Sequence, residues 1–300
     1  MASSRILLST IIPIGNLAID FENLRNIIKL SHAKPIELIF ILDTGEEQAF
    51  NQLQSLCYNE SLRSFQVVEA TGRNPGASRN IGISLAQGDW VVFCDSDDLP
   101  NFVNVIDSIL QDNNESDVLI GDYEIENLTL GTIFFRIIDK NSNSIWESIA
   151  LYPGLWRWVI KKDLLIGIRF PEYSMGEDQC FLIRTLLNEP KVNFFSEVFY
   201  RYRIGGRDSL TSTKTRINDL IPIIRLELSP NKFPQKFITF RNFVIARQIL
   251  TLFKNGTFRG KSWAVIFFVK SITLYSPAKY LSVLKYIVKE SRISLKNDSI

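Results

Sequence analysis

The sequence predicts an α/β fold, in which a mostly parallel sheet is flanked by helices and followed by a helical extension. Short apolar runs alternate with segments whose apolar residues recur at helical spacing. This alternation favours parallel strands joined by right-handed crossovers. The chain has 300 residues with 46% hydrophobic content, enough for a large core, and its last part becomes basic.

The expected elements follow from these runs in chain order. Asn74 is a favoured N-cap, Pro75 suits the first helical position, and Gly88 stops that helix. In the first part we expect strands at 6–12, 36–42, 65–68 and 90–94, with helices over 21–28, 48–56 and from Asn74 to just before Gly88. Later we expect a helix over 101–110, a strand at 117–120 and an antiparallel edge strand at 133–138. A helix should begin within 171–178, followed by a strand at 198–203.

An acidic turn follows the strand at 90–94. Its sequence is Asp95-Ser96-Asp97-Asp98. In open α/β sheets, ligands bind beyond the carboxyl ends of the strands. Three neighbouring carboxylates repel one another and need a counter-charge, which Mg²⁺ or Mn²⁺ with oxygen ligands would supply. The alternative is a solvated turn that only caps the helix starting at Pro100-Asn101.

The acidic turn is the end of a longer ordered motif. The motif reads Ala77-Ser78-Arg79-Asn80-Ile81-Gly82-Ile83, then Ala86-Gln87-Gly88-Asp89-Trp90, then the acidic turn. This series resembles the family 2 glycosyltransferases of GT-A fold, and in particular those that build bacterial surface polysaccharides. The resemblance implies a Rossmann-like catalytic domain and an inverting, metal-dependent hexosyltransferase that uses a nucleotide-sugar, most simply UDP-linked.

The resemblance also assigns the nucleotide-sugar site. In the family, the ends of the first two strands cradle the nucleotide, which here involves Pro13 and Asp43. Asp43 would accept a hydrogen bond from uracil, although it could instead be a helix N-cap. The turns after these residues depart from the family pattern: 13–16 lacks an aromatic residue and 43–46 keeps only the first acid.

Charged residues near the acidic turn complete this site. Asp97 and Asp95 would hold the metal that bridges the diphosphate, and Ser96 would contact the nucleotide-sugar. Arg79 would brace the acids or approach the diphosphate, unless it is an ordinary exposed helix charge. Arg203 and Arg207 are candidate phosphate ligands around a loop with Gly205-Gly206; the alternative is a surface hairpin with scattered charge.

A second acidic pair begins the helix after Pro171. Acids at a helix N-terminus are favoured by the helix dipole alone. In the resembling family, however, such a Glu-Asp pair carries the catalytic base, which assigns the base to Asp178 and a supporting role to Glu177. Gly176 and Trp156 are assigned to the acceptor site, although a tryptophan in this aromatic region could equally fill the core.

Several other classes of protein are disfavoured. Three scattered cysteines, Cys57, Cys94 and Cys180, indicate reduced thiols in a cytoplasmic protein, and the one histidine, His32, excludes a histidine-rich site. No apolar run is long enough to span a membrane, and we expect no nucleic-acid partner.

Two alternative functions remain. A sugar-nucleotide pyrophosphorylase would need a glycine-rich basic loop after the first strand, which residues 13–16 do not provide. A catalytically inactive, membrane-associated scaffold would lack Asp97 or Asp178, and both are present. The Gln-x-x-Arg-Trp motif of processive relatives is absent after Asp178, which favours one sugar per encounter.

The charge of the chain is divided unevenly. Residues 1–231 hold 21 Lys/Arg and 30 Asp/Glu, whereas residues 232–300 hold 13 and 2. We therefore expect a catalytic domain at 1–213 and a basic helical extension at 214–300, with a proline-rich connector before helices at 237–253, 263–275 and 279–289.

The last of these helices separates an apolar arc from a basic arc, a pattern of membrane-surface helices. We expect the extension to bind the anionic inner face of the cell membrane, where a lipid-linked or saccharide acceptor would be met. A helical hairpin packed on the catalytic domain is the alternative, and the oligomeric state is left open.

Overall fold

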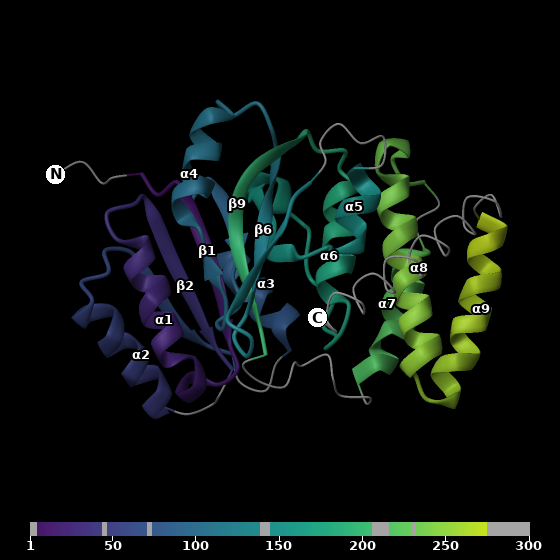
Figure 1. Ribbon diagram of the computed structural model, residues 1–300, viewed down its shortest axis with the longest axis horizontal. Helices are drawn as coiled ribbons and strands as arrows, with labels where there is room; N and C mark the ends of the chain where they lie inside the picture. Colours follow the sequence, from purple (N-terminus) through teal and green to yellow (C-terminus); the bar gives the residue numbers. More distant parts are fainter. Residues whose placement is uncertain are drawn as a thin grey trace. The chain divides into compact units, whose positions relative to one another are not determined.

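The computed structural model describes residues 5–43, 47–70, 74–138, 145–205, 216–229 and 232–274 (Figure 1). Its first half has the predicted alternation of strands and helices. These are β1 (Leu8–Ile14), α1 (Leu17–Ser31), β2 (Ile36–Leu42), α2 (Glu47–Asn59), β3 (Phe65–Glu69), α3 (Pro75–Leu85) and β4 (Trp90–Phe93).

The strand order creates a switch point between β1 and β4. The strands β3, β2, β1 and β4 are parallel neighbours in that order. The chain moves outward from β1 through β2 to β3, and then α3 carries it back to the other side of β1. Ligands of α/β proteins bind at such a reversal, beyond the carboxyl ends of the strands.

The second half of the sheet is mixed. β8 (Trp158–Lys161) is antiparallel to both β4 and β6 (Val118–Asn127), and β6 is parallel to β9 (Val192–Ile204). The two-residue strand β5 (Leu99–Pro100) is antiparallel to β9, and β7 (Thr132–Arg136) pairs antiparallel with β6, as predicted for that edge. The helices of this half are α4 (Phe102–Gln111), α5 (Ile145–Leu151) and α6 (Glu177–Leu186), with 3₁₀ turns at Leu155–Arg157 and Lys162–Leu165.

Helix α3 is held against β1 by a cap and a close approach. The side chain of Asn74 accepts a hydrogen bond from the backbone N–H of Ala77 at 2.9 Å, the N-cap predicted from the sequence. A Cβ atom on Gly82 would lie 2.3 Å from Cγ2 of the fully buried Ile11, so only glycine permits this contact. The helix is therefore fixed on the sheet against β1 and β2.

Contacts between residues divide the chain into two compact units. Unit 1 comprises residues 1–140, 154–172 and 188–208, and unit 2 comprises residues 141–153, 173–187 and 209–300. Each unit is therefore built from three separate stretches of the sequence, whereas the prediction divided the chain once, between residues 213 and 214. Those two residues lie outside the described residues.

Unit 2 is helical. Besides α5 and α6 it contains α7 (Leu220–Glu227), α8 (Ile238–Asn255) and α9 (Phe258–Leu274), with 3₁₀ turns at Arg216–Asp219 and Gln235–Phe237. Figure 1 shows α7, α8 and α9 side by side, and buried residues such as Ile224, Ile249 and Phe267 pack between them.

The expected connector before α8 was wrong in one respect, because it contains α7. Pro222 is the third residue of this helix, where the missing N–H costs no intrahelical hydrogen bond. The predicted helices at 237–253 and 263–275 correspond to α8 and α9. The predicted helix at 279–289 lies outside the described residues.

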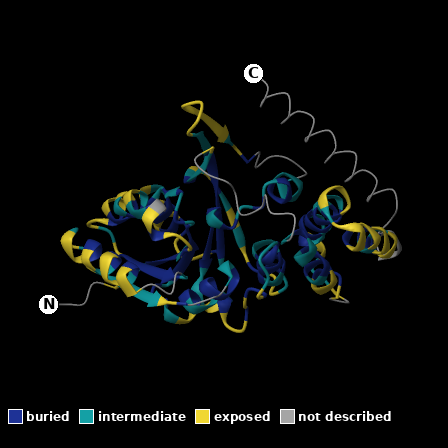
Figure 2. Cartoon of the chain, turned by 90° about the horizontal axis from the view of Figure 1, so that it is seen from below, coloured by how far each residue is buried: buried dark blue, intermediate teal, exposed yellow. Residues whose placement is uncertain are grey.

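Helix α9 leaves a mixed apolar and basic face uncovered. Phe258, Val265, Ile266 and Val269 are each more than half exposed, and Figure 2 shows exposed residues along this helix. In the part of the chain that the structure describes, no helix is both long and apolar enough to cross a membrane. The three cysteines are buried free thiols, and His32 is an exposed residue just after α1, as predicted.

Candidate active site

The acidic turn after β4 lies at the switch point and alternates between exposed and buried side chains. Asp95 and Asp97 are partly exposed, whereas Ser96 and Asp98 are buried. The two outward carboxylates are therefore in contact with solvent, and the two inward groups hold the turn in place.

Ser96 is anchored by an acid of the first helix. Its hydroxyl donates to Oδ2 of Asp20 at 2.5 Å, and Asp20 is itself 2% exposed. Ser96, which is predicted to contact the nucleotide-sugar, thus uses its hydroxyl to fix the turn to α1. Sequence reasoning missed Asp20, whose only signal was an acid in the first turn of that helix.

Asp98 is the buried acid of the turn. Its Oδ1 accepts the backbone N–H of Arg203 at 2.7 Å, which ties the turn to β9. Burial raises the pKa of Asp98 well above its ordinary value, and the nearby charges of Asp95 and Asp97 raise it further.

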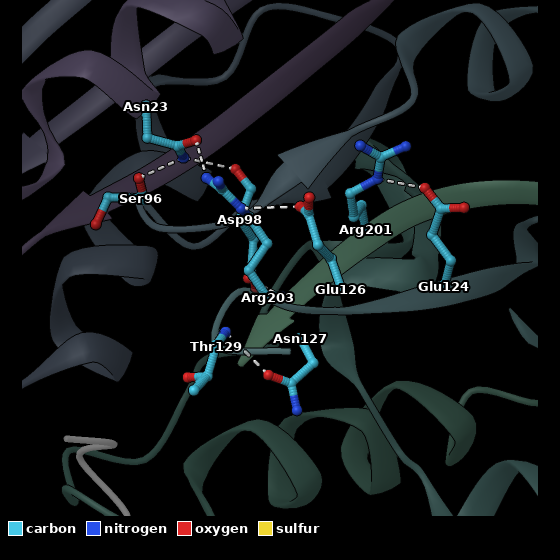
Figure 3. A network of polar contacts seen from close by, with 9 residues as sticks. All are labelled: Asn23, Ser96, Asp98, Glu124, Glu126, Asn127, Thr129, Arg201 and Arg203. Atoms are coloured by element: carbon cyan, nitrogen blue, oxygen red, sulfur yellow. Dashed lines mark hydrogen bonds and ion pairs between the residues drawn. The ribbon is translucent and has the colours of Figure 1, made fainter. Parts of the chain in front are cut away.

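A polar network surrounds the backbone of the turn (Figure 3). The side-chain amide of Asn23 on α1 donates to the carbonyl oxygens of Ser96 and Asp98, both at 2.8 Å. Its oxygen accepts from Nη1 of Arg203 at 2.7 Å, and Nε of Arg203 donates to Glu126 at 3.1 Å. Asn23 therefore joins α1, the acidic turn and β9, and it holds the guanidinium of Arg203 together with Glu126.

Arg79 pairs directly with the acidic turn. Nη2 of Arg79 lies 2.9 Å from Oδ1 of Asp95, and Arg79 is 8% exposed. Its guanidinium also lies over the ring of Phe170, 5.6 Å from the centroid. Of the roles that the sequence left open for Arg79, the structure shows the brace.

An aromatic group joins Trp156 to the same turn. The hydroxyl of Tyr200 accepts the backbone N–H of Asp95 at 2.9 Å, and the ring of Tyr200 stacks on Trp156 with centroids 4.5 Å apart. Tyr202 also stacks on Trp156, at 5.7 Å, and Trp156 is only half-buried. The tyrosines, which sequence reasoning missed, give this tryptophan a fixed place near the acids.

The predicted nucleotide residues of the first two strands lie at the same sheet edge. Pro13 pairs with Ile41, and the backbone N–H of Asp43 donates to the carbonyl oxygen of Ile14 at 2.9 Å. Because Ile11 pairs with Phe93 at the end of β4, β1 continues past the point where the acidic turn begins. The register thus brings Pro13, Asp43 and the acidic turn together.

The second acidic pair begins α6 in unit 2. Gly176 is the N-cap, with φ +80° in the left-handed region that favours glycine. Glu177 is 7% exposed, and Oδ1 of the less buried Asp178 accepts the backbone N–H of Gln179 at 2.8 Å. These contacts fix the pair at a helix start, as predicted. Arg207 lies outside the described residues.

Comparisons with known proteins agree with this arrangement. Residues 9–184 match the family model described as glycosyl transferase family 2. Poly(ribitol-phosphate) β-N-acetylglucosaminyltransferase TarP of Staphylococcus aureus is 28% identical over 197 residues, which are 61% of this chain and 57% of TarP. Across the similar curated proteins, the matched region spans from 24% to 70% of each protein's length.

Solved structures with a similar fold share little sequence identity. The structure of S. aureus TarS residues 1–349 with UDP-GlcNAc has a TM-score of 0.65 and 16% identity, covering 96% of this chain and 92% of that chain. A mannosyltransferase from Pyrobaculum calidifontis, solved with GDP-Man and Mn²⁺, has a TM-score of 0.60 and 12% identity, covering 97% and 87%. These likenesses confirm the GT-A fold.

The alternatives of a pyrophosphorylase or an inactive scaffold gain no support from these matches. The family model covers more than half of the chain, from β1 into α6, and includes the acidic turn. The protein belongs to glycosyl transferase family 2.

Proposed function

We propose that this protein transfers one sugar from a UDP-linked donor to an acceptor hydroxyl, with inversion, in the synthesis of a bacterial surface polysaccharide. The observation that carries the proposal is the acidic turn at the β1–β4 switch point, inside the region that matches the family. The name of TarP and the UDP-GlcNAc in the TarS structure support the process and the donor class.

The nucleotide would lie across the ends of β1 and β2. Asp43 would accept a hydrogen bond from an N–H of uracil, and Pro13 would border the base, because the register places both at the edge that carries the acidic turn. Arg203 and Arg207 would contact the phosphates. Arg203 retains guanidinium donors beyond the two that Asn23 and Glu126 receive.

The acidic turn fits a divalent cation that is held jointly with a diphosphate. Among the described residues, no group of three His, Cys, Asp or Glu side chains could enclose a metal ion. Mg²⁺ usually binds through one or two carboxylates, with phosphate and water oxygens as the remaining ligands. Asp97 and Asp95, both partly exposed, supply such a pair, with Ser96 holding the turn. When bound, Mg²⁺ or Mn²⁺ would neutralise charge on the departing diphosphate.

The transfer itself requires a base for the acceptor. Asp178 would take the proton from the acceptor hydroxyl as its oxygen bonds to the anomeric carbon and the bond to the diphosphate breaks. The buried Glu177 would support this carboxylate, and Gly176 and Trp156 would border the acceptor. Single displacement inverts the anomeric centre, so an α-linked donor gives a β-linked product, and one sugar is transferred per encounter.

The protein would act as a peripheral protein on the cytoplasmic face of the membrane, where a lipid-linked or saccharide acceptor is accessible. The exposed apolar residues of α9 and the basic composition of residues 232–300 support this placement.

A screen of nucleotide-sugars tests the proposal. We expect donor hydrolysis with a UDP-sugar in the presence of Mn²⁺, and much less in its absence. The Asp97→Ala variant is the control for contaminating activity. If the folded protein neither binds UDP nor hydrolyses any nucleotide-sugar with Mn²⁺ present, the proposed function is wrong.

A further inference from the structure

A buried polar pair lies within unit 2 against the start of α6. Glu227 is the last residue of α7 and is 1% exposed, and Gln248 on α8 is 3% exposed. Burial of polar groups is costly unless they are hydrogen-bonded, and apolar residues could fill the same volume. The pair is therefore a candidate for a functional role.

Gln248 links three helices. Its Nε2 donates to Oε1 of Glu227 at 3.0 Å and to Oε1 of Gln179 at 3.1 Å. The backbone N–H of Gln179 in turn donates to Oδ1 of Asp178 at 2.8 Å. A chain of hydrogen bonds thus runs from α7 through α8 to the carboxylate that we assign as the base.

The same side chain packs against the N-cap of α6. A Cβ atom on Gly176 would lie 3.5 Å from Nε2 of Gln248 and 3.0 Å from Cδ2 of Leu220. The first turn of α6 therefore rests directly on α7 and α8, and a change at Gln248 would be felt at Gly176 as well as at Gln179.

The charge state of Glu227 suits this role. Burial raises the pKa of Glu227 to about 8, so the carboxyl is mostly protonated at pH 7. The hydrogen bond from Gln248 lowers this pKa, and the charge of Asp178 raises it. Arg184 on α6 and Arg241 on α8 also face it, and Arg241 donates to its backbone carbonyl oxygen at 2.8 Å. Within the described residues Oε2 of Glu227 has no hydrogen-bond partner, so the carboxyl is held through Oε1 and Gln248.

We propose that Glu227 and Gln248 are positioning residues, which hold the first turn of α6 and thereby place Asp178 for proton transfer from the acceptor. The proposal rests on the proposed function, because it assumes that Asp178 is the base. A small displacement of a base lowers the rate of proton transfer without changing donor binding, so the effect should appear in kcat and not in KM for the donor.

Three variants and one control test this role. Gln248→Leu removes the bridging amide, and Glu227→Leu removes its partner. Glu227→Gln keeps an acceptor and a donor at the same place and imitates the protonated acid. Arg247→Leu is the matched control, because Arg247 is the neighbour of Gln248 on α8 and donates at 2.8 Å to the carbonyl oxygen of Ala150 on α5.

The first measurement is amide hydrogen exchange over residues 176–180, which needs no substrate. We expect faster exchange in Gln248→Leu and Glu227→Leu, and wild-type exchange in Glu227→Gln and Arg247→Leu. The second is steady-state transfer with the donor that the screen identifies, where kcat should fall by about tenfold to a hundredfold in the two leucine variants, with KM for the donor unchanged. Glu227→Gln should restore kcat.

The two hypotheses fail differently. Unchanged exchange in a folded Gln248→Leu variant, or faster exchange with unchanged kcat, overturns the positioning role. So does a Glu227→Gln variant as impaired as Glu227→Leu. If wild-type protein transfers no sugar from any donor, the proposed function fails, whereas the exchange result still reports whether the pair holds the first turn of α6.

Discussion

At the residue scale, the acidic turn divides its side chains between two tasks. Ser96 and Asp98 are buried and hold the turn to α1 and β9, whereas Asp95 and Asp97 face outward. Asp95 already has a counter-charge in Arg79 at 2.9 Å. The proposed metal would be held by Asp97, which the family resemblance assigns as its ligand, together with Asp95.

Asp97→Ala is expected to abolish metal-dependent binding of UDP while the protein stays folded, because Asp97 is only partly buried. Titration calorimetry with UDP, with and without Mn²⁺, measures this. Asp107→Ala removes an equally charged but exposed residue of α4 and should bind UDP normally. Unchanged Mn²⁺-dependent UDP binding by Asp97→Ala would show that the ligand lies elsewhere.

Asp178→Asn is expected to lower kcat of transfer by at least about a hundredfold with near-normal donor binding, the usual contribution of a general base. Steady-state kinetics with the identified donor measure this. Glu172→Gln, at an exposed acid six residues earlier in the chain, is the control. A variant with wild-type kcat would exclude Asp178, and Glu177 would then be the next candidate.

The buried carboxyl of Glu227 should make stability depend on pH. Its pKa is about 8 in the folded protein against 4.5 ordinarily, so its stabilising contribution is present below pH 4.5 and is lost as pH rises to about 8. The slope is at most about 1.4 kcal/mol per pH unit. We expect denaturant melts between pH 5 and 8 to show a shallower loss of stability in Glu227→Gln than in wild type. Equal slopes would contradict the raised pKa.

The sequence identified the acids but not the groups that hold them. Asp95, Asp97 and Asp178 stand in recognisable motifs, so a pattern could find them. Asn23 contacts Arg203 across 180 positions of sequence, and no local pattern reports such a contact. The roles of Ser96 as an anchor and of Tyr200 as a hydrogen-bond acceptor also depend on tertiary placement.

At the element scale, local signals predicted most of the parallel half of the sheet. The strand at 36–42 has the predicted bounds, because a fully buried strand is a continuous apolar run. The N-cap of α3 was equally readable. β5, β8 and α5 were not predicted, because these short elements of two to seven residues are set by pairing and packing with distant residues.

The contact of α3 with β1 gives a prediction at this scale. Gly82→Ala should destabilise the protein by about 1–3 kcal/mol, because the new Cβ would lie 2.3 Å from Cγ2 of Ile11. Chemical denaturation measures the change. Gly15→Ala is the control, since no atom lies within 4 Å of a Cβ there.

A second substitution tests the cause of that effect. Ile11→Ala removes Cγ1 and Cγ2, which would lie 2.9 and 2.3 Å from the new Cβ, so Gly82→Ala should cost less in an Ile11→Ala background than in wild type. An equal cost in both backgrounds would mean that the destabilisation does not arise from this contact.

At the scale of the whole molecule, the sequence predicted two consecutive domains, 1–213 and 214–300. The contacts instead group separate stretches of the sequence into each unit. Residues 141–153 and 173–187 group with the C-terminal helices, although both lie between parts of unit 1 in the sequence. Composition reports only gradual changes along a chain, so it could not show that α6 leaves the sheet to join α7 and α8.

Residues 232–300 carry an excess of eleven positive charges, and α9 presents exposed Val265, Ile266 and Val269 without any acidic residue in the helix. Each Lys or Arg near an anionic leaflet contributes on the order of 1 kcal/mol, and apolar burial adds to this.

We therefore expect the protein to sediment with anionic liposomes at low salt and to be released by high salt. Replacing Lys279, Lys285 and Lys289 together by Gln should weaken sedimentation. Replacing the exposed Lys29 and Lys191 and the partly exposed Lys34 by Gln should not. If the wild-type protein does not sediment with such liposomes at low salt, the basic residues of 232–300 serve another contact and the peripheral-membrane proposal is wrong.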